Sequence, residues 1–296
     1  MEHIPAKTIV TKTKSNDWFG CDYNMNIYKG CNHGCIYCDS RSECYRVEDF
    51  DRVRTKENAL EIIRNDLRRK VKKGVIGTGS MSDPYNSFEK EMKLTRHSLE
   101  LIDAFEFGIS IATKSTLVAR DIDILQSIKE HSPVIVKLTI TTADDAKALL
   151  IEPGASLSSE RFALLKELRK AGIFAGIMLL PVLPFINDDE ESIFQILEKA
   201  IENEARFIYP GFGVTLRMNQ RIYYYEQLQK LFPDDNYAER YRQAYGNRYH
   251  CSIPNAKELY QSFTNACAKN NILYDMRDIT HSDKGNYSDG QLRLFD

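Results

Sequence analysis

Three cysteines in one short segment carry the clearest chemical signal in this sequence. Cys31, Cys35 and Cys38 stand in the octapeptide CNHGCIYC, separated by three residues and then by two. Thiolates are soft ligands that select zinc, copper(I) or iron–sulfur clusters, and a [4Fe–4S] cluster normally takes four of them. Three thiolates from one loop would leave one iron of such a cluster free to bind and polarise a substrate or cofactor.

Zinc is the alternative metal for these thiols. A closed structural zinc site takes four ligands, so Cys21, Cys44 or His33 would have to supply the fourth. Simple packing of the three thiols is a further alternative. A spacing motif remains a hypothesis until its structural context agrees with it.

Composition narrows the class of protein. The chain has 296 residues, of which 43% are hydrophobic, and this suffices for one large domain or a domain with an appendage. It carries 40 Lys and Arg against 42 Asp and Glu, a net charge of -2, which does not describe a general polyanion-binding protein. Seven cysteines without a leading apolar segment predict a reducing cytoplasmic location. No apolar run reaches the ~20 residues that span a bilayer, so we expect no membrane partner.

The hydrophobic pattern alternates between strands and helices. We expect strands at 22–28, 75–79, 107–112, 134–141, 173–180 and 206–213, with helices at 56–73, 89–104, 119–130, 159–170 and 191–201. Such alternation predicts a parallel sheet with right-handed crossovers. Six units with the cysteine loop after the first strand predict an α/β fold, an open (β/α)6 partial TIM-type barrel. Functional residues of such barrels lie at the C-terminal ends of the strands.

The pattern also divides the chain into segments. We expect an N-terminal lead-in over 1–20, loosely held, and the partial barrel over 21–216. A helical C-terminal extension should follow over 217–281, with helices at 220–231, 238–244 and 256–269, and then a flexible tail over 282–296. The extension is rich in tyrosines, which can stack on bases when they stand among arginines. Tyrosines more often pack helices together at a domain seam.

The last six residues, Gln291 to Asp296, read QLRLFD. They resemble the QLxLF peptide by which several bacterial DNA polymerases and repair proteins dock on the DNA sliding clamp. One glutamine and three apolar anchors at the end of a polar segment suit a pocket on such a partner. The alternative is a terminal strand or an apolar patch that folds back on the domain. A sliding clamp bound through Gln291–Phe295 is therefore a predicted partner.

The cysteine spacing, with an aromatic residue (Tyr37) before the last cysteine, resembles the signature of the radical S-adenosylmethionine (SAM) superfamily. Other segments resemble one branch of it, the spore photoproduct lyase-like or "DNA repair photolyase" proteins. They are NIYKG at 26–30, GSMSD at 79–83, ATKS at 112–115, KLTIT at 137–141, IEPGAS at 151–156 and GIMLLPV at 176–182. The resemblance runs from about residue 24 to 188, with a fainter trace to about 260.

This resemblance implies an enzyme with two cofactors. Cys31, Cys35 and Cys38 would hold a [4Fe–4S] cluster, and the amino and carboxylate groups of SAM would chelate its open iron. An electron from the reduced cluster would then cleave SAM to methionine and a 5′-deoxyadenosyl radical. A reductant such as flavodoxin or ferredoxin would supply the electron. The cofactors carry this chemistry, and the protein orients them.

The resemblance also assigns four contacts with SAM by position. Tyr37 would lie along the adenine, and Ser82 would hydrogen-bond the methionyl or ribose end. Lys114 would pair with the carboxylate, and Thr139 would contact ribose or carboxylate. A zwitterionic ligand needs a cation and small hydrogen-bonding groups, which these residue types supply. The alternative for Lys114 is a solvent-facing lysine after a strand.

Two residues depart from the pattern of the lyases. Ser80 stands where the lyases carry the cysteine that returns a hydrogen atom to the product radical, and Asp39 replaces a tyrosine after the last cluster cysteine. An O–H bond is too strong to be a convenient hydrogen donor to a carbon radical. We therefore predict that this protein is not a spore photoproduct lyase. The hydrogen donor and the other catalytic residues stay unidentified, with Cys21, Cys44 and the tyrosines as candidates.

Three functions compete at this stage. The leading one is a radical SAM enzyme acting on DNA or a nucleic-acid-linked substrate, as in repair. The second is a radical SAM enzyme that modifies a peptide, protein or small metabolite, and the near-neutral charge favours it because duplex binding normally uses several phosphate contacts. The third is a non-catalytic Fe–S redox sensor that binds the clamp. The positions of Lys114 and Ser82 argue against a sensor, which does not need to hold SAM.

Overall fold

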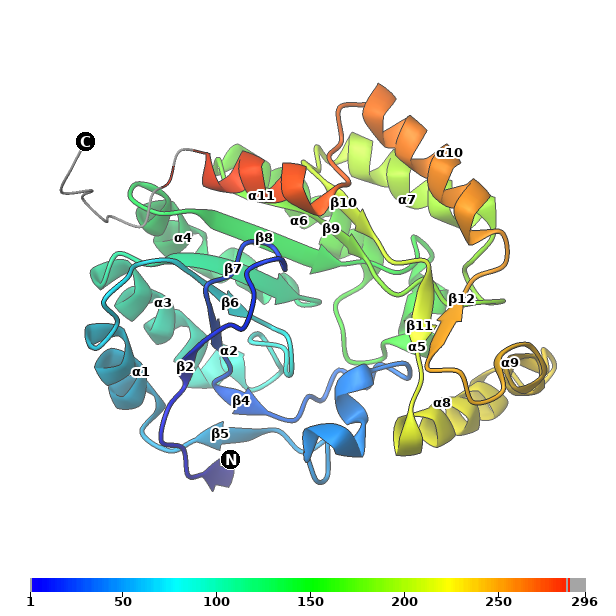
Figure 1. Ribbon diagram of the computed structural model, residues 1–296, viewed down its shortest axis with the longest axis horizontal. Coiled ribbons are helices and arrows are strands. Elements are labelled where there is room, and N and C mark those ends of the chain that lie inside the picture. The colour runs from blue at the N-terminus through cyan, green and yellow to red at the C-terminus, as the bar shows by residue number, and fades with distance from the viewer. Residues whose placement is uncertain (1, 286, 288–296) are drawn as a thin grey trace.

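A twisted, mostly parallel sheet forms the centre of the protein, as seen in a computed structural model that describes residues 2–285 and 287 (Figure 1). Within those residues, the sheet has seven strands in the order β10-β9-β8-β7-β6-β3-β2. The parallel strands are β3 (Tyr23–Met25), β6 (Val75–Thr78), β7 (Gly108–Thr113), β8 (Val134–Thr139), β9 (Phe174–Leu179) and β10 (Ile208–Pro210). β2 (Val10–Lys12) pairs antiparallel with β3. Within the described residues, the strand order ends at β10 and β2 and does not close between them, so the predicted open α/β partial barrel is confirmed.

The strands are buried on both faces, which explains their continuous apolar sequences. β8, with the sequence VIVKLT, is buried along its whole length. Val134 and Val136 point into the main core beneath the helices. Ile135, between them, belongs to a smaller cluster inside the curve of the sheet. This alternation follows from the two-residue period of a strand.

The longer helices that follow the strands cover the outer face of the sheet (Figure 1). They are α1 (Ala59–Arg68), α3 (Leu94–Ala104), α4 (Ile122–Lys129), α6 (Ser158–Lys170) and α7 (Glu190–Glu202). Two shorter helices are α2 (Glu89–Met92) and α5 (Asp145–Ile151), and Ile151 at the end of α5 packs with the cysteine loop. A short 3-10 helix, η3 (Thr116–Asp121), precedes α4. The helix predicted at 89–104 is broken at Lys93, which has a φ of 52°. The buried carboxylate of Glu89 accepts a hydrogen bond from the backbone of Thr95 and thereby starts the second helix.

The N-terminal lead-in is part of the fold, and the prediction of a loosely held segment is wrong. β1 (Glu2–Ile4) pairs with β5 (Arg54–Lys56), which also pairs with β4 (Tyr28–Lys29), and β2 forms the edge of the main sheet. The carboxylate of Asp66 accepts hydrogen bonds from the backbone amides of Ile9 and Val10. These are backbone contacts, so the polar side chains of the segment gave no sign of them.

The C-terminal extension contains α8 (Met218–Leu231), α9 (Tyr237–Tyr245), α10 (Ala256–Lys269) and α11 (Met276–Lys284). It also contains a strand, β12 (His250–Ser252), which pairs with β11 (Gly213–Thr215). The predicted boundary at 216/217 therefore separates two paired strands, and α11 continues past the predicted start of the tail at 282. The Gln291–Phe295 motif lies outside the described residues. Among the residues that are described, no helix combines the length and apolar character needed to cross a membrane.

Phe19 and helix α11, which are far apart in the sequence, meet at the base of the barrel, where the strands begin. Phe19 is 1% exposed and packs against Phe207, with ring centroids 6.0 Å apart. Its backbone amide lies 3.2 Å from the sulfur of Met276, the first residue of α11, 257 positions later in the chain. Phe19 and the apolar face of α11 therefore close the interior of the barrel from below.

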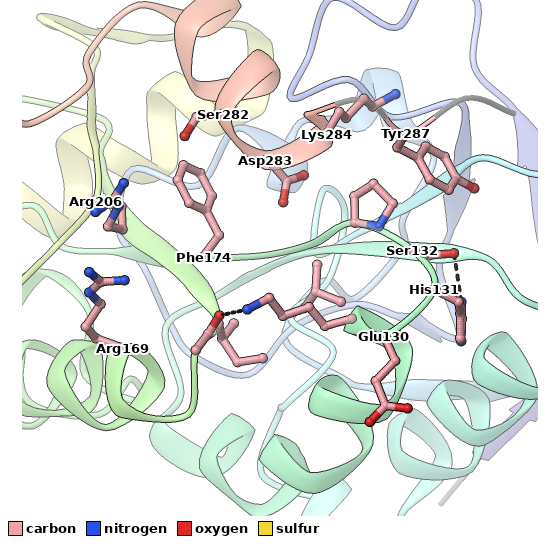
Figure 2. Close-up of a pocket in the computed structure, with 15 residues that line it drawn as sticks. Glu130, His131, Ser132, Arg169, Phe174, Arg206, Ser282, Asp283, Lys284 and Tyr287 are labelled. Atoms are coloured by element: carbon pink, nitrogen blue, oxygen red, sulfur yellow. Dashed lines mark hydrogen bonds between the residues drawn. The ribbon is translucent and has the colours of Figure 1, made fainter.

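A pocket of about 470 Å³ lies beside this closure, between the starts of β8 and β9 and α11 (Figure 2). Asp283 extends from α11 into it. Burial raises the pKa of Asp283 to about 7, against the opposing effect of Lys137 and Lys284. Lys137 is itself buried inside the barrel, where it donates a hydrogen bond of 2.6 Å to the hydroxyl of Ser110. The base of the barrel thus carries a carboxyl group that titrates near neutral pH.

Asp283 should make the protein less stable as the pH rises. Because its folded-state pKa of about 7 lies above the ordinary 3.8, the native state binds more protons than the unfolded state between these values, and the free energy of unfolding falls across that window. We expect Asp283→Asn to flatten this dependence and to stabilise the protein by about 1–2 kcal/mol near pH 8, after allowance for solvent screening. Urea unfolding near pH 5 and near pH 8 measures the effect. Asp234 is exposed, and its Asp234→Asn variant serves as control. If the free energy of unfolding of Asp283→Asn still fell between pH 5 and pH 8 as much as that of the wild type, the prediction would be contradicted.

Candidate active site

A cavity of about 180 Å³ lies at the C-terminal ends of the parallel strands. Its lining comes from the cysteine loop, from the C-terminal ends of β7, β8 and β9, and from the segments that follow β6, β7 and β9. The lining residues are Cys31, His33, Cys35, Cys38, Ser40, Phe50, Gly79, Ser80, Met81, Ser82, Asp83, Ala112, Thr113, Lys114, Thr139, Met178 and Leu180. This is the end of a barrel at which functional residues are expected, so the cavity is the candidate active site.

The three cysteines of the motif all line this cavity. Burial raises the pKa of each thiol, to about 11 for Cys31, while Lys114 opposes the rise at Cys35 and Cys38. Within the described residues, no three His, Cys, Asp or Glu side chains lie close enough together to hold a single metal ion. A [4Fe–4S] cluster does not need such a grouping, because each of its irons takes its own thiolate. Three thiols on one cavity therefore fit such a cluster with one open iron.

None of the three residues proposed as a fourth zinc ligand has a side chain that is free to bind a metal beside the cysteines. Cys21 packs inside the barrel with Phe19 and Phe207. Cys44 is exposed, and its sulfur lies 3.4 Å from the guanidinium of Arg217. Both ring nitrogens of His33 face other acceptors. The positions of these side chains therefore favour the cluster over a closed zinc site.

The cysteine loop passes so close to a neighbouring segment that it needs glycine. Gly30, which precedes Cys31, has a φ of 82°, a conformation that glycine adopts readily because it has no Cβ atom. A Cβ atom at this position would lie 2.5 Å from the carbonyl oxygen of Arg52 and 2.7 Å from that of Phe50. The amide of Cys31 donates a hydrogen bond of 2.9 Å to the Phe50 carbonyl. The start of the loop is thus fixed by backbone contacts.

His33 fastens the loop to two further segments. Its Nδ1 lies 2.7 Å from the carbonyl oxygen of Gly154, and its Nε2 lies 3.1 Å from the carboxylate of Asp83. Both partners are acceptors, so this setting favours the protonated form of the ring, in which both nitrogens are donors. Burial lowers the pKa of His33, but Asp83 and the Gly154 carbonyl together raise it above its ordinary value. Asp83 also accepts hydrogen bonds from the Thr113 hydroxyl and the Lys114 amide, so it joins the cysteine loop to the end of β7.

Three of the four predicted SAM contacts line the cavity: Ser82, Lys114 and Thr139. Within the described residues, the Lys114 ammonium forms no hydrogen bond or ion pair, and it lies 5.7 Å from the centre of the Tyr37 ring. Burial lowers the pKa of Lys114, but Cys35 and Glu152 raise it above the ordinary value. The Ser82 hydroxyl donates to the carbonyl of Gly30 and keeps its lone pairs for a ligand. A half-buried cation without a partner suits an anionic ligand group, because charges that are withdrawn from water are normally paired.

Tyr37, the fourth predicted contact, is not among the residues that line the cavity. Its side chain is 6% exposed and packs in the cluster that joins the cysteine loop to the C-terminal extension. Its hydroxyl donates a hydrogen bond to Glu152, and its carbonyl accepts one of 3.1 Å from Gln220. The contact with adenine stays a prediction.

Asp39, where the lyases have a tyrosine, is held by an arginine of the extension. It lies in the 3-10 helix η1 (Asp39–Arg41), followed by η2 (Glu43–Tyr45). Arg217 donates to both of its oxygens, at 3.0 and 2.7 Å, and the hydroxyl of Tyr45 donates at 2.6 Å. Arg217 also lies over the rings of Tyr45 and Tyr249, at 5.2 and 4.7 Å. The partners are 178 positions apart, so no local sequence signal could reveal the pair.

The candidate hydrogen donors are not brought together at the cavity. Ser80 lines it, in the position where the lyases carry their donor cysteine. Cys21 lies in the barrel interior and Cys44 lies at the surface beside Arg217. The geometry therefore assigns no cysteine besides the three of the motif to the cavity wall within the described residues.

Comparison with known proteins matches residues 25–197 to the Radical SAM superfamily. An uncharacterized protein of Mycobacterium tuberculosis is 30% identical over 230 residues, which cover 75% of this chain and 67% of that protein. An uncharacterized protein of Methanocaldococcus jannaschii is 36% identical over 190 residues, covering 63% and 69%. A "Radical SAM Nalpha-GlyT isomerase" of Pseudomonas phage M6 is 23% identical over 197 residues, covering 65% and 40%.

Among solved structures, "Spore photoproduct lyase complexed with dinucleoside spore photoproduct" has a similar fold. The TM-score is 0.64 at 14% sequence identity, over 90% of this chain and 79% of that chain. At this identity the likeness concerns the fold. The family match spans more than half of the chain and contains the cysteine loop together with the other segments that line the cavity. The chain therefore belongs to the radical SAM superfamily, whose enzymes use a [4Fe–4S] cluster and S-adenosylmethionine.

Proposed function

We propose that Cys31, Cys35 and Cys38 hold the cluster, that Lys114 with Ser82 and Thr139 binds SAM beside it, and that the enzyme acts on DNA or a nucleic-acid-linked substrate. The cofactor assignment is supported by one observation: three thiols and an unpaired lysine face the same cavity. When bound, the cluster and SAM supply a 5′-deoxyadenosyl radical through reductive cleavage of SAM.

The residues of the chain have two tasks in this proposal. The half-buried Lys114 ammonium attracts the carboxylate of SAM, and hydrogen bonds between such charged groups are stronger than those between neutral groups. The side chains of Phe50, Met178 and Leu180 form apolar walls of the cavity. Such walls limit the access of water and so protect a reactive species from side reactions.

The nucleic-acid substrate is supported by arginine–aromatic stacks beside the cysteine loop. Arg217 lies over Tyr45 and Tyr249, and Tyr249 is 50% exposed. Arg41 lies over Tyr223 and Phe50, at 3.8 and 5.1 Å, and Phe50 lines the cavity. Bases that are splayed out of a helix stack on aromatic rings and guanidinium planes. The solved lyase of similar fold holds a dinucleoside, which is consistent with this class of substrate.

Ser80 supports a reaction different from that of a lyase with a cysteine donor. It lines the cavity, and its O–H bond is too strong for convenient hydrogen return to a carbon radical. The enzyme proposed here is therefore repair-like in substrate class and distinct in its final hydrogen transfer.

A peptide, protein or small metabolite is the second candidate substrate. This candidate is favoured because the two arginines beside the cysteine loop are already neutralised. Arg217 pairs with Asp39 at 2.7 Å, and Arg41 pairs with Asp51 at 2.5 Å. Phosphate binding would have to compete with these carboxylates, and nucleic-acid affinity normally rests on several phosphate contacts.

The test is an anaerobic assay. The protein is reconstituted with iron and sulfide, reduced with dithionite and given SAM, and 5′-deoxyadenosine is measured by mass spectrometry with and without single-stranded oligonucleotides. The proposal predicts stimulation by oligonucleotides and binding that weakens as salt rises. Stimulation by peptides or metabolites alone would favour the second candidate. A loaded cluster that neither binds nor cleaves SAM would refute both.

The C-terminal motif supports a sliding clamp as partner, alongside a reductant such as flavodoxin or ferredoxin. We expect deletion of residues 291–296, which lie outside the described structure, to leave SAM cleavage unchanged and to abolish binding to a bacterial clamp, because the glutamine and three apolar anchors are lost together. Surface plasmon resonance on immobilised clamp measures this. A chain with the same six residues in scrambled order is the control, and undiminished binding by the truncated chain would exclude the motif.

A further inference from the structure

A buried carboxylate lies directly behind the cysteine loop. Glu152 follows α5, and its side chain is 1% exposed. Its Oε1 accepts hydrogen bonds from the hydroxyls of Tyr37 and Thr141, and its Oε2 accepts one of 2.8 Å from Arg161. The carboxylate therefore links the cysteine loop, the segment after β8 and helix α6 through one side chain.

Arg161 is the fixed counterion of Glu152. It is fully buried on α6 and also donates to the carbonyl of Thr139, at the end of β8. Replacing a buried ion pair by apolar residues is often neutral or stabilising, so such a pair is weak evidence for a role in stability. The pair instead fixes the position of the Glu152 carboxylate relative to a strand end that lines the cavity.

The backbone around Glu152 is docked on the cysteine loop. The amide of Ile36 donates to the carbonyl of Ile151 at 3.0 Å, and the amide of Gly154 donates to that of His33 at 2.8 Å. A Cβ atom on Gly154 would lie 2.6 Å from the carbonyl oxygen of Asn32, so the close contact depends on glycine. Residues 151–154 are therefore hydrogen-bonded along the cysteine loop through their backbone, and Glu152 adds a side-chain hydrogen bond to Tyr37 of that loop.

Lys114 lies near the ring of Tyr37, the tyrosine that Glu152 hydrogen-bonds. Its ammonium is 5.7 Å from the ring centre of Tyr37, whose hydroxyl Glu152 holds. In the described residues, no oxygen of Glu152 comes within 4.0 Å of that ammonium, because the carboxylate is occupied by Arg161, Thr141 and Tyr37. Glu152 thus offers a counter-charge to Lys114 without pairing with it, which leaves Lys114 available to the cavity.

We propose that Glu152 is a positioning residue for both cofactors: through Tyr37 it sets the Cys35–Cys38 half of the cysteine loop, and it keeps Lys114 directed at the cavity. This inference rests on the assignment of the cysteines and Lys114 made above. Glu152 does not itself line the cavity, so it acts through the residues that do. Outer partners of metal ligands typically change affinity or activity by about 10- to 100-fold when they are replaced.

Two variants test the inference. Glu152→Gln removes the charge while keeping the shape, but it leaves Arg161 buried without its counterion and risks misfolding. Tyr37→Phe removes only the hydroxyl bond to Glu152 and keeps the ion pair. Tyr241→Phe is the matched control, since Tyr241 is a fully buried tyrosine of the same apolar cluster whose hydroxyl bonds Tyr224 at 3.0 Å.

The readouts are iron and sulfide per chain, the electron paramagnetic resonance spectrum of the reduced cluster with and without SAM, and the Kd for SAM. We expect Tyr37→Phe to retain its iron, to show an altered spectrum and to bind SAM about 10-fold more weakly, with Tyr241→Phe unchanged in all three. Glu152→Gln should show the same changes at larger amplitude.

Wild-type spectra and wild-type SAM affinity in Tyr37→Phe would overturn the inference, as would equal losses in Tyr241→Phe. Failure of the wild-type protein to take up a cluster or SAM would instead overturn the proposed function on which the inference rests. The two failures are therefore distinguishable in one set of measurements.

Discussion

Replacing Cys35 by alanine should abolish both cluster binding and SAM cleavage. Cys35 is the middle cysteine of the motif, buried in the wall of the cavity, and its loss would leave two thiols where an iron–sulfur cluster normally takes four. We expect iron content near background after reconstitution and no 5′-deoxyadenosine by mass spectrometry. The same result is expected for Cys31→Ala and Cys38→Ala.

Two other cysteines provide matched controls for this experiment. Cys44 is exposed and Cys267 is buried, and neither lines the cavity. Their alanine variants should keep iron content and SAM cleavage at wild-type levels. A Cys35→Ala variant that still cleaved SAM would refute the assignment of the cluster ligands.

Replacing Lys114 by methionine should weaken SAM binding while leaving the cluster in place. Methionine keeps much of the length and apolar character of the side chain but removes the ammonium that faces the cavity. A hydrogen bond to a charged group contributes about 1.5–3 kcal/mol, so the Kd for SAM should rise by about 10- to 100-fold. Isothermal titration of the anaerobically reconstituted protein measures this change.

The exposed Lys199, which pairs with Glu202 on α7, gives the control Lys199→Met. That variant should bind SAM as the wild type does. Iron content must stay equal in both variants, because the expected effect is on SAM and not on the cluster. Wild-type affinity in Lys114→Met would show that the carboxylate of SAM is bound elsewhere.

The sheet could be predicted from the sequence because its strands are buried on both faces. A continuous apolar run such as that of β8 leaves few alternatives, and the regular spacing of helices between such runs indicates parallel pairing. The cysteines could be predicted because their spacing is local. Ser82, Lys114 and Thr139 could be placed at the cavity because each lies at or just after the C-terminal end of a strand.

The residues that sequence reasoning missed act through distant partners. Asp39 and Arg217 are 178 positions apart, and Tyr37 and Glu152 are 115 apart. Glu152 stood in a segment that resembled the lyase-like branch, but nothing in its spacing indicated that a buried arginine would fix it. The lead-in was missed for a related reason, because backbone bonds to Asp66 hold it.

The tyrosines of the extension differ in how deeply they are buried. Tyr224 and Tyr241 are fully buried and hydrogen-bonded to each other at 3.0 Å, which is helix packing at a seam. Tyr249 is half exposed and stacked with Arg217 beside the cysteine loop. Whether a tyrosine is buried depends on which helix face packs against the barrel, and the spacing of tyrosines in the sequence does not determine that.

The meeting of Phe19 and Met276 at the base of the barrel has a consequence for synthesis on the ribosome. Domains fold as their residues emerge, N-terminal parts first, but the two sides of this contact are separated by 257 positions. Until α11 has emerged, the interior around Phe19 and Phe207 lacks its lower cover. The nascent chain therefore carries an apolar opening between the synthesis of Phe207 and that of α11, and a chain shortened before residue 276 would keep that opening permanently.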